Sequence, residues 1–204
     1  TEAMRALFGA DPRLDGVVEI DGKPVAITAP KDAVRHGLSL LTEDRKGQGL
    51  LLDLAVDKNI TITDLGKVSR HGLVNRRAEA AAANDLIGQL RVKASSIEQA
   101  VRNLSGGNQQ KVVIGKMLAT DPKVILLDEP SRGIDIGAKA EVFRILAHHA
   151  AAGQAVVFTT SEVNECLSIA HRIIIMRRGR ISAEFTSDIT KEKIMAASGE
   201  AVAA

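Results

Sequence analysis

Two segments decide the fold and chemistry of this chain: LSGGNQQ at residues 104–110 and VILLDEP at residues 124–130. The first places a serine and two glycines where a helix is expected to begin. The second is an apolar strand that ends in two carboxylates. Backbone N–H groups, a hydroxyl and the positive end of a helix dipole together favour phosphate binding. We therefore expect a phosphate-handling site, with Asp128 directed at a magnesium ion and Glu129 at an attacking water.

In this order the segments resemble the signature motif, Walker B strand and D-loop of ATP-binding cassette (ABC) ATPases. The resemblance rests on LSGGNQQK and ILLDEPSRGID. The finer pattern adds TEDRKGQGL upstream and TTSEVNE downstream. It is similar to the second nucleotide-binding half of the ATP-binding subunits of carbohydrate importers of the ribose, galactose and xylose type. This resemblance extends over nearly the whole chain.

The composition is that of a globular domain with a substantial core. The chain has 204 residues, 45% of them hydrophobic and 25% charged, with a formal net charge of +2. Aromatic residues make up only 2%, which argues against a platform that stacks nucleic-acid bases. The lone Cys166 excludes an internal disulfide and is expected as a small apolar side chain on a helix. Because no apolar run approaches the roughly 20 residues of a membrane helix, we expect membrane association only through a partner protein.

The hydrophobic pattern alternates between strands and helices. Lys123–Leu127 and Ala155–Thr160 are continuous apolar strands, and Gly137–Ala151 between them is an amphipathic helix. Such alternation predicts a parallel sheet covered on both faces. The expected fold class is α/β, a mostly parallel sheet of the P-loop NTPase (ABC ATPase) type with helices on both faces and a helical subdomain.

Further elements are expected along the rest of the chain. Asp21-Gly22 predicts a tight hairpin turn, and helical periodicity runs from Val56 to about Val101. The expected elements are a helix over residues 1–8, a hairpin over 17–25, a helix over 30–36, a strand over 38–41, helices over 56–65, 76–90 and 109–118, a hairpin over 173–185 and a helix over 190–197. We interpret residues 1–204 as one partial nucleotide-binding domain, incomplete at its N-terminus. The helical subdomain spans about 52–118 and the RecA-like core the remainder.

The resemblance implies roles for individual residues. Ser105, Gly106 and Gly107, with Asn108 beside them, would meet the γ-phosphate of an ATP carried by a partner domain. Asp128 would hold magnesium and Glu129 would orient and deprotonate the attacking water, while Asp135 would act across a dimer. Simpler alternatives remain open: a helix or turn cap for Asp128, a solvated acid for Glu129 and a helix N-cap for Asp135.

Three departures from the family pattern bear on activity. The chain contains no G-x-x-x-x-G-K-[ST] loop, so we expect it to begin just after that P-loop. Glu43 stands where the family usually has a glutamine, and Glu162 where it usually has the switch histidine. An added carboxylate near phosphate is repulsive unless a cation or proton intervenes. A loop acid and a helix N-terminal acid are the structural alternatives for these two glutamates.

The functional hypothesis is a C-terminal nucleotide-binding domain of a two-domain sugar-importer ATPase, with ATP and Mg²⁺ as cofactors. The expected partners are an N-terminal nucleotide-binding domain of the same subunit or a second copy, transmembrane permease subunits and, indirectly, a periplasmic or extracellular sugar-binding protein, with no nucleic acid. The expected location is the cytoplasmic face of the cell membrane, and the isolated chain is expected to be inactive. The alternatives are a non-hydrolysing regulatory or structural half-domain, or an ABC-type ATPase of another system.

Overall fold

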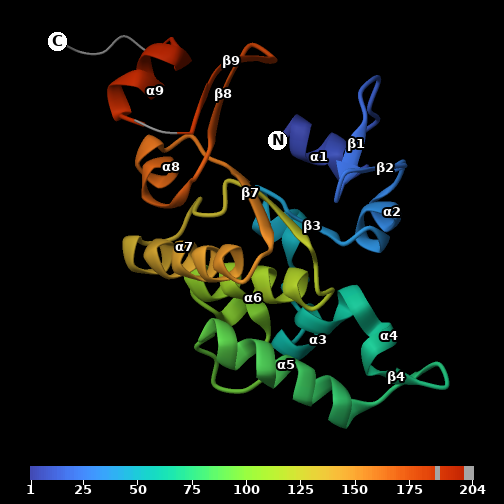
Figure 1. Cartoon of the computed structure of the whole chain (residues 1–204). Helices are drawn as coiled ribbons and strands as arrows, with labels where there is room; N and C mark the ends of the chain where they lie inside the picture. The colour runs from blue at the N-terminus through green and yellow to red at the C-terminus, as the bar shows by residue number, and fades with distance from the viewer. Residues whose placement is uncertain (187–188, 200–204) are drawn as a thin grey trace. The chain divides into compact units, whose positions relative to one another are not determined.

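A computed structural model describes residues 1–186 and 189–199 and divides into two compact units, Thr1–Thr159 and Thr160–Ala204. Figure 1 shows the helices and strands of both units. The first unit is built around a three-stranded parallel sheet of order β3-β6-β7. Its strands are β3 (Leu38–Leu41), β6 (Val124–Asp128) and β7 (Ala155–Thr159). The parallel apolar strands expected from the sequence are confirmed.

The central strand β6 sets the register of this sheet. Leu41 of β3 lies opposite Leu127, and Thr159 of β7 lies opposite Asp128. Parallel strands present their carboxyl ends at one edge, where α/β folds place their ligands. Asp128, which ends β6, and Glu129, which follows it, therefore lie at the edge of the sheet where α/β folds bind their ligands.

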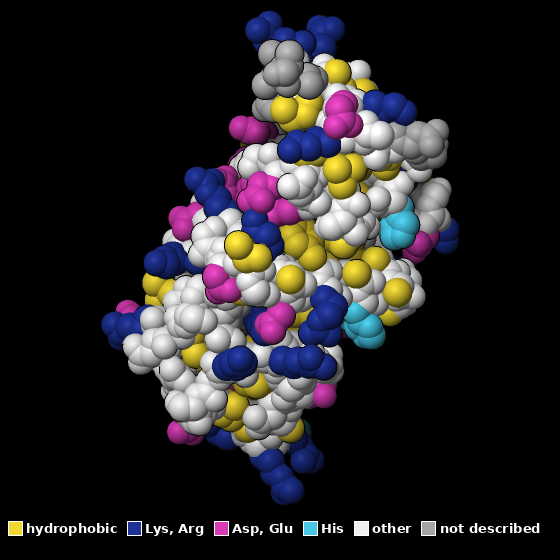
Figure 2. Space-filling model, turned by 90° about the vertical axis from the view of Figure 1, so that its left-hand side faces the viewer, with side chains coloured by type: hydrophobic (Ala, Val, Ile, Leu, Met, Phe, Trp, Pro, Cys, Tyr) yellow, Lys and Arg dark blue, Asp and Glu magenta, His cyan; other side chains and the backbone are white. Residues whose placement is uncertain are grey.

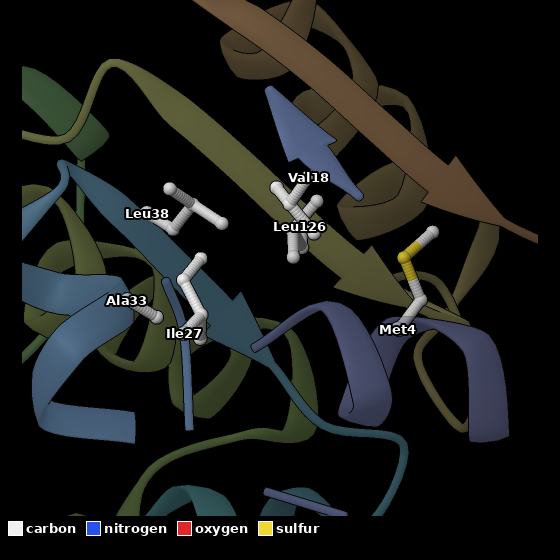
Figure 3. Packing of buried hydrophobic residues seen from close by; sticks show 6 residues of the cluster. All are labelled: Met4, Val18, Ile27, Ala33, Leu38 and Leu126. Atoms are coloured by element: carbon white, nitrogen blue, oxygen red, sulfur yellow. The ribbon is translucent and has the colours of Figure 1, made fainter. Parts of the chain in front are cut away.

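Helices cover both faces of the sheet. On one face, Leu126 and Leu38 pack with side chains from α1 (Glu2–Leu7), β1 (Val18–Ile20) and α2 (Pro30–Arg35). Figure 3 shows this cluster, whose members are Met4, Val18, Ile27, Ala33, Leu38 and Leu126. Side chains alternate along a strand, so Ile125 and Leu127, both buried, point to the opposite face. There α6 (Gly106–Leu118) packs on β3 and α7 (Ile136–Ala151) on β7.

The N-terminal elements match their sequence signals. β1 pairs antiparallel with β2 (Lys23–Val25) around Asp21 and Gly22, whose φ angles are 53° and 71°. Asp-Gly is favoured in such turns because both central residues need positive φ. The hairpin expected over residues 17–25 is confirmed.

The region expected to be continuously helical is more broken. The helix expected over Val56–Leu65 ends earlier, and the structure has α3 (Val56–Thr61), a 3-10 turn (Ile62–Asp64) and α4 (Leu65–Val68). A short hairpin that the periodicity did not predict follows, β4 (Ser69–Arg70) with β5 (Leu73–Val74). His71 and Gly72 form its turn, both with positive φ. The helix α5 (Arg76–Leu90) was predicted with these bounds, and a 3-10 turn (Val101–Asn103) precedes α6.

The second unit contains α8 (Val163–Ile169), the antiparallel pair β8 (Ile173–Arg177) and β9 (Arg180–Phe185), and α9 (Lys191–Ser198). The expected hairpin and last helix are confirmed, and Cys166 lies on α8 as expected. Among the described residues, no helix has both the length and the apolar character needed to cross a membrane. Figure 2 shows Lys and Arg side chains interspersed with Asp and Glu over the visible face.

Candidate functional site

The signature segment, Ser105–Asn108, forms the beginning of α6. Ser105 is the N-cap residue with extended backbone, and its Oγ accepts from the Asn108 N–H at 3.4 Å and from Asn108 Nδ2 at 3.0 Å. Asn108 Oδ1 in turn accepts from the Lys93 N–H at 2.8 Å. Ser105 is exposed, whereas Gly107 in the first turn of this 13-residue helix is buried. An anion approaching Ser105 would meet its hydroxyl group and the positive end of the helix dipole.

The two signature glycines also have a reason inside the chain. A Cβ on Gly107 would overlap the methyl group of Ala138 in α7. A Cβ on Gly106 would lie 3.2 Å from the Gly133 carbonyl oxygen and 3.3 Å from Arg45 Nη2. Because a side chain fits at neither position without displacing a neighbour, the glycines allow α6 to dock on the segment that follows β6. The sequence suggested only their use in approaching a phosphate.

Asp128 ends β6 in a buried and hydrogen-bonded position. It is 3% exposed, and the Thr159 hydroxyl donates to its Oδ1 at 2.7 Å. Thr159 lies opposite it in the register of β6 and β7. The next residue, Glu129, is half-buried and has a φ of 48°. A non-glycine residue in the left-handed region is strained, and such strain concentrates at functional sites.

A cavity of about 410 Å³ lies beside Asp128. Its lining residues come from three segments of the first unit: Thr1, Arg5, Leu40, Thr42, Glu43, Asp44, Gln48, Asp128 and Arg132. Glu43 forms an ion pair with Arg132 and lies 3.4 Å from the Thr1 hydroxyl. The structure thus brings Glu43 and Asp128 together at one cavity. Ser105–Asn108 are not among the described residues that line it.

Arg5 and Arg132 place two cations at this cavity that sequence reasoning missed. The hydrogen bond to Asp11 raises the pKa of Arg5 most, and the negative charge of Asp11 raises it further. The charge of Asp128 makes a smaller contribution. Arg132 stands within the quoted DEPSRGID segment, so its position next to the carboxylates was a usable signal. Arg5 carries no such signal, because its place depends on how α1 packs on β6.

Asp135 and Glu162 both precede helices. The Asp135 carboxylate caps α7, accepting from the Ala138 N–H at 2.9 Å, so the structural alternative for Asp135 is realised. The Glu162 N–H donates to the Thr160 hydroxyl at 3.0 Å, and Glu162 stands at the N-cap position of α8. It belongs to the second unit, whereas Asp128 and Glu129 belong to the first. Its role toward phosphate stays a prediction.

The donor set around Asp128 fits a magnesium ion. Among the described residues there is no group of three or more His, Cys, Asp or Glu that could hold a metal. Magnesium does not need one, because it commonly uses one or two carboxylates, keeps several waters and shares substrate phosphates. Asp128, the Thr1 hydroxyl and Glu43 supply oxygen atoms for such an incomplete coordination at the cavity, which Arg5 and Arg132 also line.

Comparison with known proteins identifies the family. The family model described as ABC transporter matches residues 1–132, which include α6 and the end of β6. The chain belongs to the ABC transporter family. Asp135 and Glu162 lie beyond the matched residues of this ABC transporter family member.

Curated relatives align with almost the whole length of this ABC transporter family member. The ribose import ATP-binding protein RbsA 1 of Streptomyces coelicolor is 48% identical over 97% of the chain. RbsA of Chromobacterium violaceum is 44% identical over 97% of the chain. The chain covers 39% of each relative's length, so it spans about two-fifths of these proteins.

Solved ATP-binding cassettes share the fold of this ABC transporter family member. A nucleotide-free ATP-binding cassette from an ABC transporter has a TM-score of 0.78 at 19% identity, covering 98% of this chain and 79% of that one. A dimeric, post-hydrolysis cassette bound to ADP and phosphate has a TM-score of 0.75 at 21% identity, covering 91% and 79%. The α/β fold of the ABC ATPase type that the sequence predicted is therefore confirmed.

Proposed function

We propose that this chain is part of the ATP-hydrolysing subunit of an ABC importer for a carbohydrate of the ribose, galactose or xylose class. It contributes the signature segment, the Walker B carboxylates and the D-loop to composite ATP sites formed with another nucleotide-binding domain. The subunit works at the cytoplasmic face of the membrane, bound to permease subunits that receive sugar from a binding protein. This proposal is supported by relatives named ribose import ATP-binding proteins.

The observation that carries hydrolysis is the end of β6. Asp128 is buried and fixed by Thr159, and Glu129 follows it in a strained left-handed conformation. The Glu129 N–H donates to the Thr159 carbonyl at 3.1 Å, and its carbonyl accepts from the Arg132 N–H at 3.1 Å. Both backbone groups of Glu129 are thus hydrogen-bonded, and its positive φ turns the chain out of the strand. This arrangement suits a carboxylate that must be placed at a water rather than in the sheet.

Each residue of the candidate site would have a separate role. Asp128 would hold magnesium beside the Thr1 hydroxyl, and Glu129 would accept a proton from the attacking water. A bound magnesium ion would neutralise charge on the β- and γ-phosphates. Ser105 and the N–H groups at the start of α6 would bind the γ-phosphate of an ATP held by the partner domain. These contacts would form only when the domains close, which would couple hydrolysis to movement.

The test replaces Glu129 by glutamine in the complete subunit assembled with its permease. Glu129→Gln keeps the size and removes the proton acceptor, so kcat for ATP hydrolysis should fall by roughly 10²- to 10⁴-fold while nucleotide affinity is retained. Glu98→Gln, at an exposed glutamate of the same unit, is the matched control. An unchanged kcat for Glu129→Gln would refute the catalytic role and favour a non-hydrolysing half-domain.

A further inference from the structure

Arg45 connects three segments that are distant in sequence. It begins a five-residue π-helical turn, Arg45–Gly49, shortly after β3. One guanidinium nitrogen, Nη1, donates to Gln110 Oε1 and to the Arg132 carbonyl oxygen, both at 3.3 Å. The other, Nη2, donates to the Gly133 carbonyl oxygen at 3.4 Å. A single side chain thus joins the loop of Glu43 to α6 and to the Glu129–Gly133 turn.

Gln110 extends this connection through the interior. It is 2% exposed, and while its Oε1 accepts from Arg45, its Nε2 donates to the Pro130 carbonyl oxygen at 2.6 Å. Both ends of the buried amide are therefore satisfied. The Glu129–Gly133 turn is held at Pro130 by Gln110 and at its far end by Arg45. Gln110, on the signature helix α6, thus connects Arg45 to the Pro130 carbonyl.

A second link runs beside the first. Glu43 forms an ion pair with the side chain of Arg132, whose carbonyl oxygen is bound by Arg45. The Arg45 Nε–H group is buried and has no hydrogen-bond partner among the described residues, and burial lowers the pKa of this guanidinium. Burying a polar group without a partner is unfavourable. An arginine at this position despite the cost indicates that its hydrogen bonds through Nη1 and Nη2 matter for the fold.

We propose that Arg45 is a positioning residue that holds the Glu129–Gly133 turn in register with the signature helix. The inference rests on the proposed function, in which Glu129 and the signature segment serve ATP hydrolysis. A displacement of the Glu43 loop would reach this turn and the signature helix together, because Arg45 bonds to the far end of the turn and to Gln110 of α6. Arginine is required because its planar fork reaches three acceptors at once, whereas a lysine ammonium on a single flexible stem does not.

The first test is amide hydrogen exchange on the chain itself, with Arg45→Lys and Arg45→Gln. Arg35→Lys and Arg35→Gln are matched controls, since Arg35 has an exposed side chain and an ion pair with Asp32 on α2. In both Arg45 variants, exchange in residues 131–136 should become roughly tenfold faster or more. Exchange in α5 should stay at the wild-type rate. An unchanged rate in residues 131–136 overturns the proposal.

The second test separates positioning from general weakening. In the complete subunit, Arg45→Lys should lower kcat for ATP hydrolysis by roughly tenfold or more, with an unchanged dissociation constant for a non-hydrolysable ATP analogue. Faster exchange with an unchanged kcat overturns the proposal. The exchange measurement requires no ATP, and Glu129→Gln reports on the proposed function alone. Failure of the Arg45 inference is therefore distinguishable from failure of the proposed function.

Discussion

The Thr159 hydroxyl donates a 2.7 Å hydrogen bond to Oδ1 of Asp128, across the pair of strands that carries the candidate site. Asp128 is 3% exposed, so this bond replaces water at a carboxylate that the fold removes from solvent. The conformation of the residue proposed to hold magnesium therefore depends on its neighbouring strand.

Replacing that hydroxyl should destabilise the chain. Thr159→Val keeps the shape of the side chain but removes one hydrogen-bond donor from a buried carboxylate, which costs about 1 to 3 kcal/mol. Thr159→Ser retains the donor and should lose less. Urea unfolding of the three proteins measures the difference, and equal free energies of unfolding for Val and Ser would show that the bond contributes nothing.

The close docking of α6 on α7 should make Gly107 intolerant of a methyl group. Gly107→Ala places a Cβ on the methyl of Ala138 and should cost about 1 to 3 kcal/mol through overpacking. Gly88→Ala is the matched control, because that helical glycine faces open space and should gain about 0.5 to 1 kcal/mol. The double variant Gly107→Ala with Ala138→Gly should recover part of the loss in thermal unfolding. No recovery would contradict this packing explanation.

Glu79 should make stability depend on acidity. It is 2% exposed and forms ion pairs with Lys58 and Arg76. Burial, the largest single influence, raises the pKa of Glu79, but the bond and charge of Lys58, the Thr61 hydroxyl and the charge of Arg76 together lower it below 4.5. A lowered pKa in the folded state means that the contribution is complete above the unfolded value and is lost as pH falls through the folded value.

The variant Glu79→Gln tests this dependence. At neutral pH it should lower the free energy of unfolding by about 1.5 to 3 kcal/mol, because charged hydrogen bonds are lost. Below pH 4.5 the difference from wild type should shrink. Glu98→Gln, at an exposed site, should change neither quantity. A difference that is constant across this pH range would show that Glu79 does not titrate with folding.

The outer edge of β7 should promote association between chains. Among the described residues, β7 has β6 as its only strand neighbour, and Val157 is 43% exposed. Unpaired strand edges attract further strands unless charge blocks them. Light scattering of the isolated chain should therefore show concentration-dependent association that Val157→Lys reduces. Val34→Lys, at a comparably exposed valine on α2, should leave it unchanged, and an equal effect of both variants would argue against the edge.

Local sequence signals predicted the fold better than the details of the site. The apolar run of β6, the Asp21-Gly22 turn and the helix α5 each carry their information within a few residues. The hairpin β4–β5 was missed because two-residue strands show no alternation, and its turn uses His71 with Gly72. The helical periodicity on either side therefore predicted a continuous helical region there.

The contacts that hold the site could not be read from spacing. Arg45 meets Gln110, 65 positions away, and Gly133, 88 positions away, and such pairs depend on how helices dock. Residue types alone pointed to Ser105, Asp128 and Glu129, because hydroxyls, glycines and paired carboxylates suit phosphate chemistry. The structure adds Thr159, which bonds to Asp128, and the contacts of Gln110 and Arg45 with the turn that follows β6.

The measurement that most directly tests the central claim compares Ser105→Asn with Ser105→Asp in the complete subunit. Both residues are good helix N-caps, so α6 should begin normally in each, and only the asparagine leaves the site uncharged. Steady-state ATP hydrolysis should fall less than about tenfold for asparagine, since one hydrogen bond is altered. For aspartate it should fall roughly 100-fold or more, because a carboxylate replaces a donor to the γ-phosphate. Equal rates for the two variants would contradict a signature segment that meets ATP.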